Sequence, residues 1–199
     1  NLFIFPSLLF QTLWVVVFLQ SLIVAHLFRL VLRVIYGTTS VLHFLALILF
    51  MCLLTNLPWF TGFIMPDIFT GVLILAIFLM MFCHAKLTRS EKTYLFILIV
   101  LSVTVHFSHL PIAFGLLFFA WILKVSKWRW KILQRMQLFY SGIALVLALV
   151  LMLGYGYWSH GFLTISPSGY SYLLARLVAD GPAVLYLREH CPQKKYALC

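Results

Sequence analysis

The sequence predicts an all-α, polytopic helical membrane protein with about four full spans, a short helical hairpin or kinked pair, and a small amphipathic helical tail. The chain of 199 residues is 64% hydrophobic and only 9% charged, and its mean hydropathy is +1.10. This composition lies far outside that of water-soluble domains. Its apolar runs also suit membrane helices, since a hydrocarbon core of roughly 30 Å needs about 20 residues per helix. We expect a transmembrane domain over residues 1–160 and an extracytoplasmic tail over residues 161–199.

The first two spans are predicted from two apolar runs separated by a polar break. Residues 7–32 form the first run, which ends at Arg29 and Arg33. The segment "YGTTS" follows and offers Gly and Ser/Thr residues that cap helices. Residues 41–57 form the second run. We expect each run to cross the membrane once.

A third span is predicted over residues 68–82. Pro66 stands at the start of this helix and Asp67 in its first turn, where a fixed φ and a negative charge are both favourable. The span ends in the basic segment "HAKLTRSEK". Its cationic end indicates the cytoplasm.

The next apolar run, residues 94–125, is too long for one crossing. As a single helix it would measure about 48 Å at 1.5 Å per residue. It contains "HFSHLP", in which His106, Ser108 and His109 precede Pro111, and proline removes a backbone donor and breaks helices. We therefore predict two short helices joined by a turn, or a sharply kinked pair, with arms of about 22 Å each.

Ten Lys and Arg residues lie in the short segments between the apolar runs. They are Arg29, Arg33, Lys86, Arg89, Lys92, Lys124, Lys127, Arg129, Lys131 and Arg135. A hairpin over residues 94–125 places all ten on one side of the membrane, whereas a single crossing divides them equally. Because cytoplasmic loops collect Lys and Arg, we predict the hairpin, with these loops in the cytoplasm. Membrane orientation then explains the net charge of +10, and we expect no nucleic-acid partner.

A last span and an amphipathic tail complete the prediction. Residues 138–157 are rich in Leu, Val and Ala, and "YGYWSH" at their end is typical of an aromatic membrane-interface belt. In the tail, apolar residues recur at helical spacing, and Pro182 is expected at the first position of a second short helix. Cys191 and Cys199 could form a disulfide if the tail faces an oxidising compartment.

This topology places Asp67, His106 and His109 on the same, outer side of the membrane. A carboxylate with two imidazoles could bind a divalent metal or act as a general base, and ionisable groups near membrane depth are candidate catalytic residues. Simpler roles stand beside this one. Asp67 could only cap the third span, and the histidines could only satisfy backbone groups freed by Pro111. A Ser108/His106/Asp67 triad can also be written, but nothing in the sequence fixes its geometry.

The middle of the chain, in "LPWFTGFIMPDIFTGVLILAIFLMMF" and "YLFILIVLSVTVHFSHLPIAFGLLFFAWIL", resembles the central transmembrane region of GT-C type glycosyltransferases. These polytopic enzymes use polyprenyl-phosphate-linked sugars. In that family an Asp often opens a span after a short outer loop, and a following pair of short helices carries a polar turn. Asp67 and the turn from His106 to Pro111 occupy those places. The resemblance implies that Asp67, His106 and His109 line an outward cavity near the phosphate of a lipid-linked sugar donor.

Other classes of protein fit the same pattern. The tail segment "ARLVADGPAVLYLREHCP" resembles extracytoplasmic segments of bacterial membrane proteins of uncharacterised activity, and we expect a bacterial inner membrane with its lipids as partners. In a transporter or channel subunit, the three site residues would line a proton or ion path. A non-catalytic membrane anchor would only present the tail to a partner. The chain begins at Asn1 and ends at Cys199, and we expect it to be a fragment of a longer protein.

Overall fold

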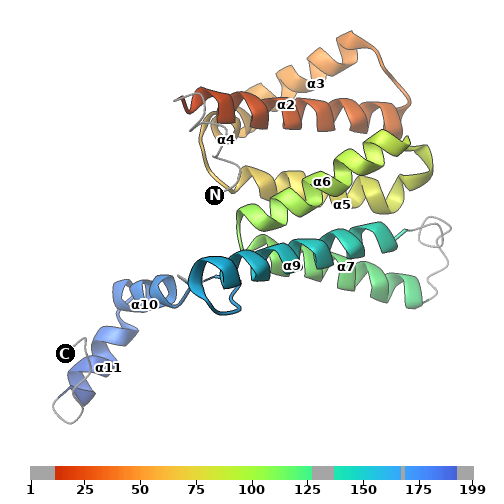
Figure 1. Cartoon of the computed structure of the whole chain (residues 1–199). Helices are drawn as coiled ribbons and strands as arrows, with labels where there is room; N and C mark the ends of the chain where they lie inside the picture. Colours follow the sequence, from red (N-terminus) through yellow and green to blue (C-terminus); the bar gives the residue numbers. More distant parts are fainter. Residues whose placement is uncertain (1–11, 127–136, 167–168, 192–199) are drawn as a thin grey trace. The chain divides into compact units, whose positions relative to one another are not determined.

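The computed structural model describes residues 12–126, 137–166 and 169–191, and every element in these ranges is a helix (Figure 1). The predicted all-helical class is therefore confirmed for this part of the chain. The elements are α2 (Trp14–Val31), η1 (Leu32–Tyr36, a π-helical turn), α3 (Val41–Leu54), α4 (Leu57–Gly62), α5 (Ile68–Phe82), η2 (His84–Lys86), α6 (Arg89–Val105), α7 (His109–Val125), α9 (Phe139–His160), α10 (Gly169–Ala179) and α11 (Pro182–His190).

The chain divides into two compact units, Asn1–Leu151 and Met152–Cys199, with the boundary inside α9. This division concerns packing and does not test the predicted change from membrane domain to outer tail at residue 160. That boundary stays a prediction.

Helix α5 is the centre of the first unit. It packs against α6, α2 and α7, and its buried side chains include Phe69, Leu73 and Ile77. A helix that is apolar all round is expected to be buried, because no face gains from contact with water. Leu27 of α2 and Ile99 of α6 are also buried. The core of this unit therefore forms around α5.

The break between α6 and α7 lies where the sequence predicts it. Helix α6 ends at Val105, His106 is extended with φ −145° and ψ 127°, and α7 begins at His109. Pro111 lies in the first turn of α7, where its missing N–H would have no helical partner. The two helices have 17 residues each and run in opposite directions (Figure 1). The prediction of two short helices joined by a turn is confirmed.

Two helical segments are long and apolar enough to cross a membrane. They are Trp14–Tyr36 and Phe139–His160, and only 28% and 22% of their most apolar windows are buried. The apolar helices α3, α5 and α7 are shorter than 18 residues. By length and composition, the described chain thus holds two candidate spans, and the predicted number of about four spans stays a prediction.

Polar contacts join η1, η2 and α6 at one end of the first unit. Most of the Lys and Arg residues that the structure describes in this unit lie at that end. Arg33 forms an ion pair with Glu91 at 2.6 Å, and the Lys86 ammonium donates to the carbonyl of Val34 at 2.9 Å. Thr88 and Glu91 form a capping box at the start of α6. The predicted loop cations Lys127, Arg129, Lys131 and Arg135 lie outside the described residues.

The charge of Glu91 is expected to stabilise this end of the fold in a pH-dependent way. Burial alone would raise the pKa of the Glu91 carboxyl, but hydrogen bonds from Thr88 and the Arg33 guanidinium outweigh it and lower the pKa below its usual 4.5. Glu91→Gln keeps the capping geometry and removes the charge. At neutral pH we expect this change to lower the free energy of unfolding by about 0.5–1 kcal/mol, which corresponds to about 1–4 °C in Tm.

The pH profile tests the cause of this loss. Because the folded-state pKa is lowered, the stabilisation is complete above pH 4.5 and disappears as the pH falls through the folded-state pKa. The melting curves of wild type and Glu91→Gln should therefore converge in acid. Glu189→Gln, in the exposed tail, is the control and should not change Tm. A difference that persists unchanged in acid would contradict the assignment.

The second unit contains the end of α9 and the two tail helices. The chain folds back so closely after α9 that a Cβ on Gly156 would collide with the Thr164 carbonyl. Gly181, with φ +97°, separates α10 from α11, and Pro182 is the first residue of α11, as predicted. Cys191 is disulfide-bonded. Its predicted partner, Cys199, lies outside the described residues.

Candidate functional site

His109 is the most deeply buried residue of the predicted site, with 1% of its surface exposed. Its Nδ1 lies 2.6 Å from the carbonyl oxygen of Ser102 in α6, and its Nε2 lies 2.9 Å from the hydroxyl of Thr70 in α5. A carbonyl only accepts hydrogen bonds, so Nδ1 must carry a proton. In the neutral ring, Nε2 then accepts the hydrogen bond of the Thr70 hydroxyl. One imidazole thus connects α5, α6 and α7.

The end of α6 explains why an imidazole is needed there. The last carbonyls of a helix have no partner within the helix. In a continued helix the Ser102 carbonyl would accept from the N–H of His106, but His106 is extended. The His109 ring supplies the missing donor, and the His109 N–H donates to the His106 carbonyl at 3.0 Å. The ring thus satisfies a carbonyl that is left free where α6 ends. The predicted role concerned backbone groups freed by Pro111, and it stays a prediction.

His106 is held differently, by its own turn. Its Nδ1 lies 2.6 Å from the Ser108 hydroxyl and accepts from the Ser108 N–H at 3.3 Å. The ring is half-buried and stacks on Phe107, and its centroid lies 5.6 Å from that of His109. Within the described residues, Nε2 of His106 makes no hydrogen bond. Because Nδ1 accepts from the Ser108 N–H, Nε2 carries the proton of the neutral ring and is free to donate.

Asp67 occupies the N-cap position of α5, but its exposed carboxylate makes no capping hydrogen bond. Its backbone carbonyl accepts a hydrogen bond from the Thr70 N–H at 3.0 Å. Thr70 lies one turn further along α5, and its hydroxyl contacts His109. The start of α5, which follows Asp67, lies at the same end of the helices as the α6–α7 turn (Figure 1).

The three predicted site residues are therefore only partly brought together. The two imidazoles are neighbours, whereas Asp67 makes no hydrogen bond to either ring among the described residues. The Ser108–His106 contact of the hypothetical triad is present, but it is a local turn contact that lacks the carboxylate.

The structure does not build a metal site from these residues. Among the described ranges, no group of three or more His, Cys, Asp or Glu side chains is arranged to hold a metal ion. Both ring nitrogens of His109 already have partners, so metal binding there would require the loss of one of them. The metal-ligand role of Asp67, His106 and His109 stays a prediction.

The sequence prediction missed three polar residues near this end. Thr70 and Ser102 hold His109 from two other helices, and Gln20 of α2, which is 2% exposed, donates through Nε2 to the carbonyls of Thr61 and Phe63 at 2.6 and 2.8 Å. Gln20 could have been found, because it is an amide within a long apolar run and buried polar groups need partners. Its two bonds hold the segment that leads to Asp67.

Replacing Gln20 by leucine is expected to loosen that segment. The change would leave two carbonyls without their donor at similar side-chain volume. Because these hydrogen bonds are only part-buried, we expect a total cost of about 1–3 kcal/mol, or about 2–12 °C in Tm. Thermal melting of the detergent-purified chain, followed by circular dichroism, measures this. The adjacent variant Ser21→Ala loses only a local bond to the Val17 carbonyl and should shift Tm much less. Equal shifts would contradict the role of the Gln20 amide.

The fold and this site define a helical protein with an extensive exposed apolar surface and a polar turn at one end of its helices. No protein-family model, curated protein sequence or solved structure matches the chain.

Proposed function

We propose that the chain is an integral membrane protein whose helices cross the bilayer several times. The observation that carries this proposal is the exposed apolar surface. Helix α3 buries none of its 14 residues, although it consists almost entirely of apolar side chains. Its exposed residues include Leu42, Leu49 and Leu53. In water such a surface would cause association, whereas lipid tails solvate it.

The charges give the proposed orientation. The end of α2, the end of α5 and the start of α6 lie at one end of the helices of the first unit, where Arg33, Lys86 and Glu91 make their contacts. The start of α5 and the α6–α7 turn lie at the other end (Figure 1). By the positive-inside rule, the first end faces the cytoplasm of a bacterial cell and the second faces outward. The outward end then holds an exposed carboxylate and an imidazole with one open nitrogen.

For the activity, we propose transfer of a sugar from a polyprenyl-phosphate-linked donor, the reaction implied by the GT-C resemblance. In this proposal His106 exchanges a proton through Nε2, Asp67 provides negative charge at the same surface, and His109 is a positioning residue. A neutral imidazole suits proton transfer near neutral pH. A divalent metal would find the Asp67 carboxylate open, whereas both nitrogens of His109 are occupied and His106 would first have to give up its bond from the Ser108 N–H so that Nε2 loses its proton.

Membrane insertion is tested first, by extraction of the expressed chain. Alkaline carbonate and urea should leave it in the membrane pellet, and only detergent should release it. Recovery in the soluble fraction would overturn the membrane proposal.

The activity is tested separately, with the purified full chain in lipid vesicles that contain a radiolabelled polyprenyl-phosphate-linked hexose. We expect release or transfer of the sugar above the level in protein-free vesicles. Chain that inserts but leaves the donor intact would overturn the transferase proposal while the membrane proposal stands. A protein-dependent proton leak in the same vesicles would instead identify a transporter.

A further inference from the structure

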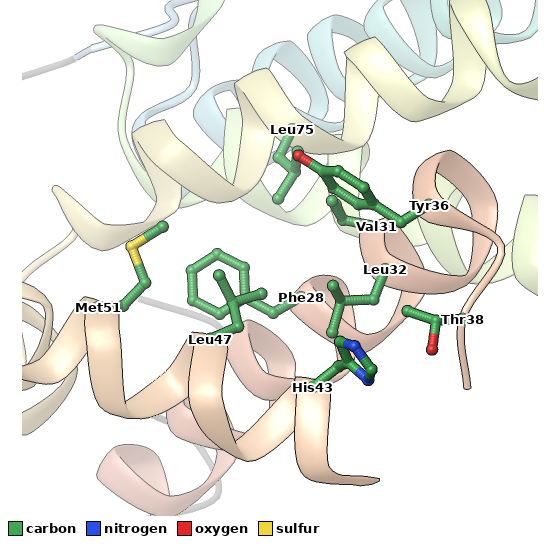
Figure 2. A pocket seen from close by; sticks show the side chains of 9 residues that line it. All are labelled: Phe28, Val31, Leu32, Tyr36, Thr38, His43, Leu47, Met51 and Leu75. Atoms are coloured by element: carbon green, nitrogen blue, oxygen red, sulfur yellow. The ribbon is translucent and has the colours of Figure 1, made fainter. Parts of the chain in front are cut away.

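An apolar groove of about 570 Å³ has three walls (Figure 2). One wall is α2 together with η1, the second is α3 and the third is α5. Phe28, Leu47, Met51 and Leu75 form its walls from three different helices. A second cavity of about 140 Å³ shares Phe28 and Leu75 with it and continues toward Leu57. The volume falls within the roughly 300–1,000 Å³ of ordinary ligand pockets. The groove is thus large enough for a ligand, and its walls offer that ligand apolar contact.

The groove exists because α3 packs loosely. None of the side chains of α3 is buried, and α2 and α5 bury theirs against other helices. No polar side chain of α3 reaches across the groove to a partner among the described residues. In a bilayer such a space is open to lipid tails.

Polar groups collect at one end of the groove. Thr38 and His43 lie there, together with the backbone of Tyr36, whose hydroxyl points toward Leu75, and Met51 lies at the opposite end (Figure 2). The hydroxyl and imidazole groups are hydrogen-bond donors suited to phosphate oxygens. Neither Arg29 nor Arg33 lines the groove, but the exposed Arg29 belongs to the end of α2 that forms this wall, whereas Arg33 is paired with Glu91. The polar end of the groove therefore coincides with the cationic end of the helices, which complements an anionic headgroup.

The length of the groove fits one lipid tail. From His43 to Met51 along α3, eight residues cover about 12 Å. The tails of one leaflet cover about 15 Å, half of the roughly 30 Å hydrocarbon core, and the smaller cavity extends the groove further toward Leu57. A lipid with its headgroup at the cytoplasmic surface would lay its tail along this groove.

We propose that the groove binds one acyl chain of an anionic glycerophospholipid, with the headgroup phosphate near Thr38 and His43. This inference rests on the proposed membrane location, and it places a lipid site at the end of the helices opposite Asp67. Because α3 has few protein contacts, the bound tail would supply part of its packing surface.

Native mass spectrometry of the full chain tests the proposal. The chain is extracted in a mild detergent, delipidated, and mixed with equal amounts of palmitoyl-oleoyl phosphatidylglycerol and phosphatidylcholine. We expect one phosphatidylglycerol to be retained per chain, at least about tenfold over phosphatidylcholine. Leu47→Trp fills the groove and should lose this lipid. Leu49→Trp is the control, because Leu49 lies on the same helix, is 59% exposed and does not line the groove.

Each other outcome overturns the inference in a recognisable way. A chain that carbonate extraction places in the membrane but that retains no lipid overturns the groove proposal alone. Equal retention by Leu47→Trp and Leu49→Trp also overturns it, because the lipid would then bind elsewhere. A dimer that Leu47→Trp dissociates would show that a second copy occupies the groove. A chain in the soluble fraction removes the membrane proposal and this inference together.

Discussion

His109→Leu is expected to lower the Tm of the detergent-purified chain by roughly 5–15 °C, the largest stability effect among the changes considered. Leucine fills a similar space but donates no hydrogen bond. The Ser102 carbonyl would then be buried without a hydrogen-bond partner, which costs about 1–3 kcal/mol of folding stability. The Thr70 hydroxyl would lose an interhelical bond, which is worth about 0.6–1.7 kcal/mol inside a membrane protein. The two losses together give about 2–4 kcal/mol.

Two variants distinguish the loss of the His109 hydrogen bonds from a general sensitivity of the α6–α7 turn to substitution. Thr70→Val removes only the interhelical bond and should cost less than half as much. His106→Ala changes the neighbouring imidazole, which is half-buried and bonded only within its own turn, and should shift Tm by no more than a few degrees. A His109→Leu protein that melts with the wild type would disprove the role of His109 in joining α5, α6 and α7.

The second large effect concerns activity. In vesicles that contain the labelled donor, His106→Ala is expected to slow sugar release by about 100-fold or more, since a positioned general acid–base group contributes about 10²–10⁴-fold. Asp67→Asn removes the negative charge at the same surface and should also slow sugar release. Both side chains are at least partly accessible, and neither makes a hydrogen bond to another helix among the described residues. The fold should therefore survive both changes, and unchanged melting curves would verify this.

The matched controls lie in the second unit. Asp180→Asn and His160→Ala change the same residue types at exposed positions and should keep wild-type rates. Added imidazole should restore part of the activity of His106→Ala, because a small base can occupy the vacated space. Rates within a few-fold of wild type for both site variants, in a preparation that consumes donor, would show that the active site lies elsewhere.

Local sequence signals predicted much of the fold. The bounds predicted for the third span, residues 68–82, are those of α5. The break before Pro111 was predicted because proline and the polar cluster act on their own neighbours in the chain. The start of α6 at Arg89 was placed too late, at residue 94, although Thr88 and Glu91 have the spacing of a capping box. In this case polar residues begin the helix ahead of its apolar run.

The candidate site could be predicted only in outline. Polarity and the positive-inside rule indicated that Asp67, His106 and His109 share one end. The sequence could not predict that His109 is bonded to two other helices while His106 is bonded only within its own turn. The bonds of His109 depend on Ser102 and Thr70, which reach its ring only after α5, α6 and α7 have packed. Periodicity within one helix contains no information on such contacts between helices.

The π-helical turn η1 allows one short segment to make two separate contacts, one with Glu91 and one with the groove. In a regular α-helix, Arg33 and Tyr36 would be close neighbours, because residues three apart lie next to each other on the helix surface. A wider turn spreads them, so that Arg33 meets Glu91 while Tyr36 reaches the groove. Deleting a single residue from this turn would restore the regular winding and force one of the two contacts to be given up. The irregular turn thus sets the rotational register between the ion pair and the groove.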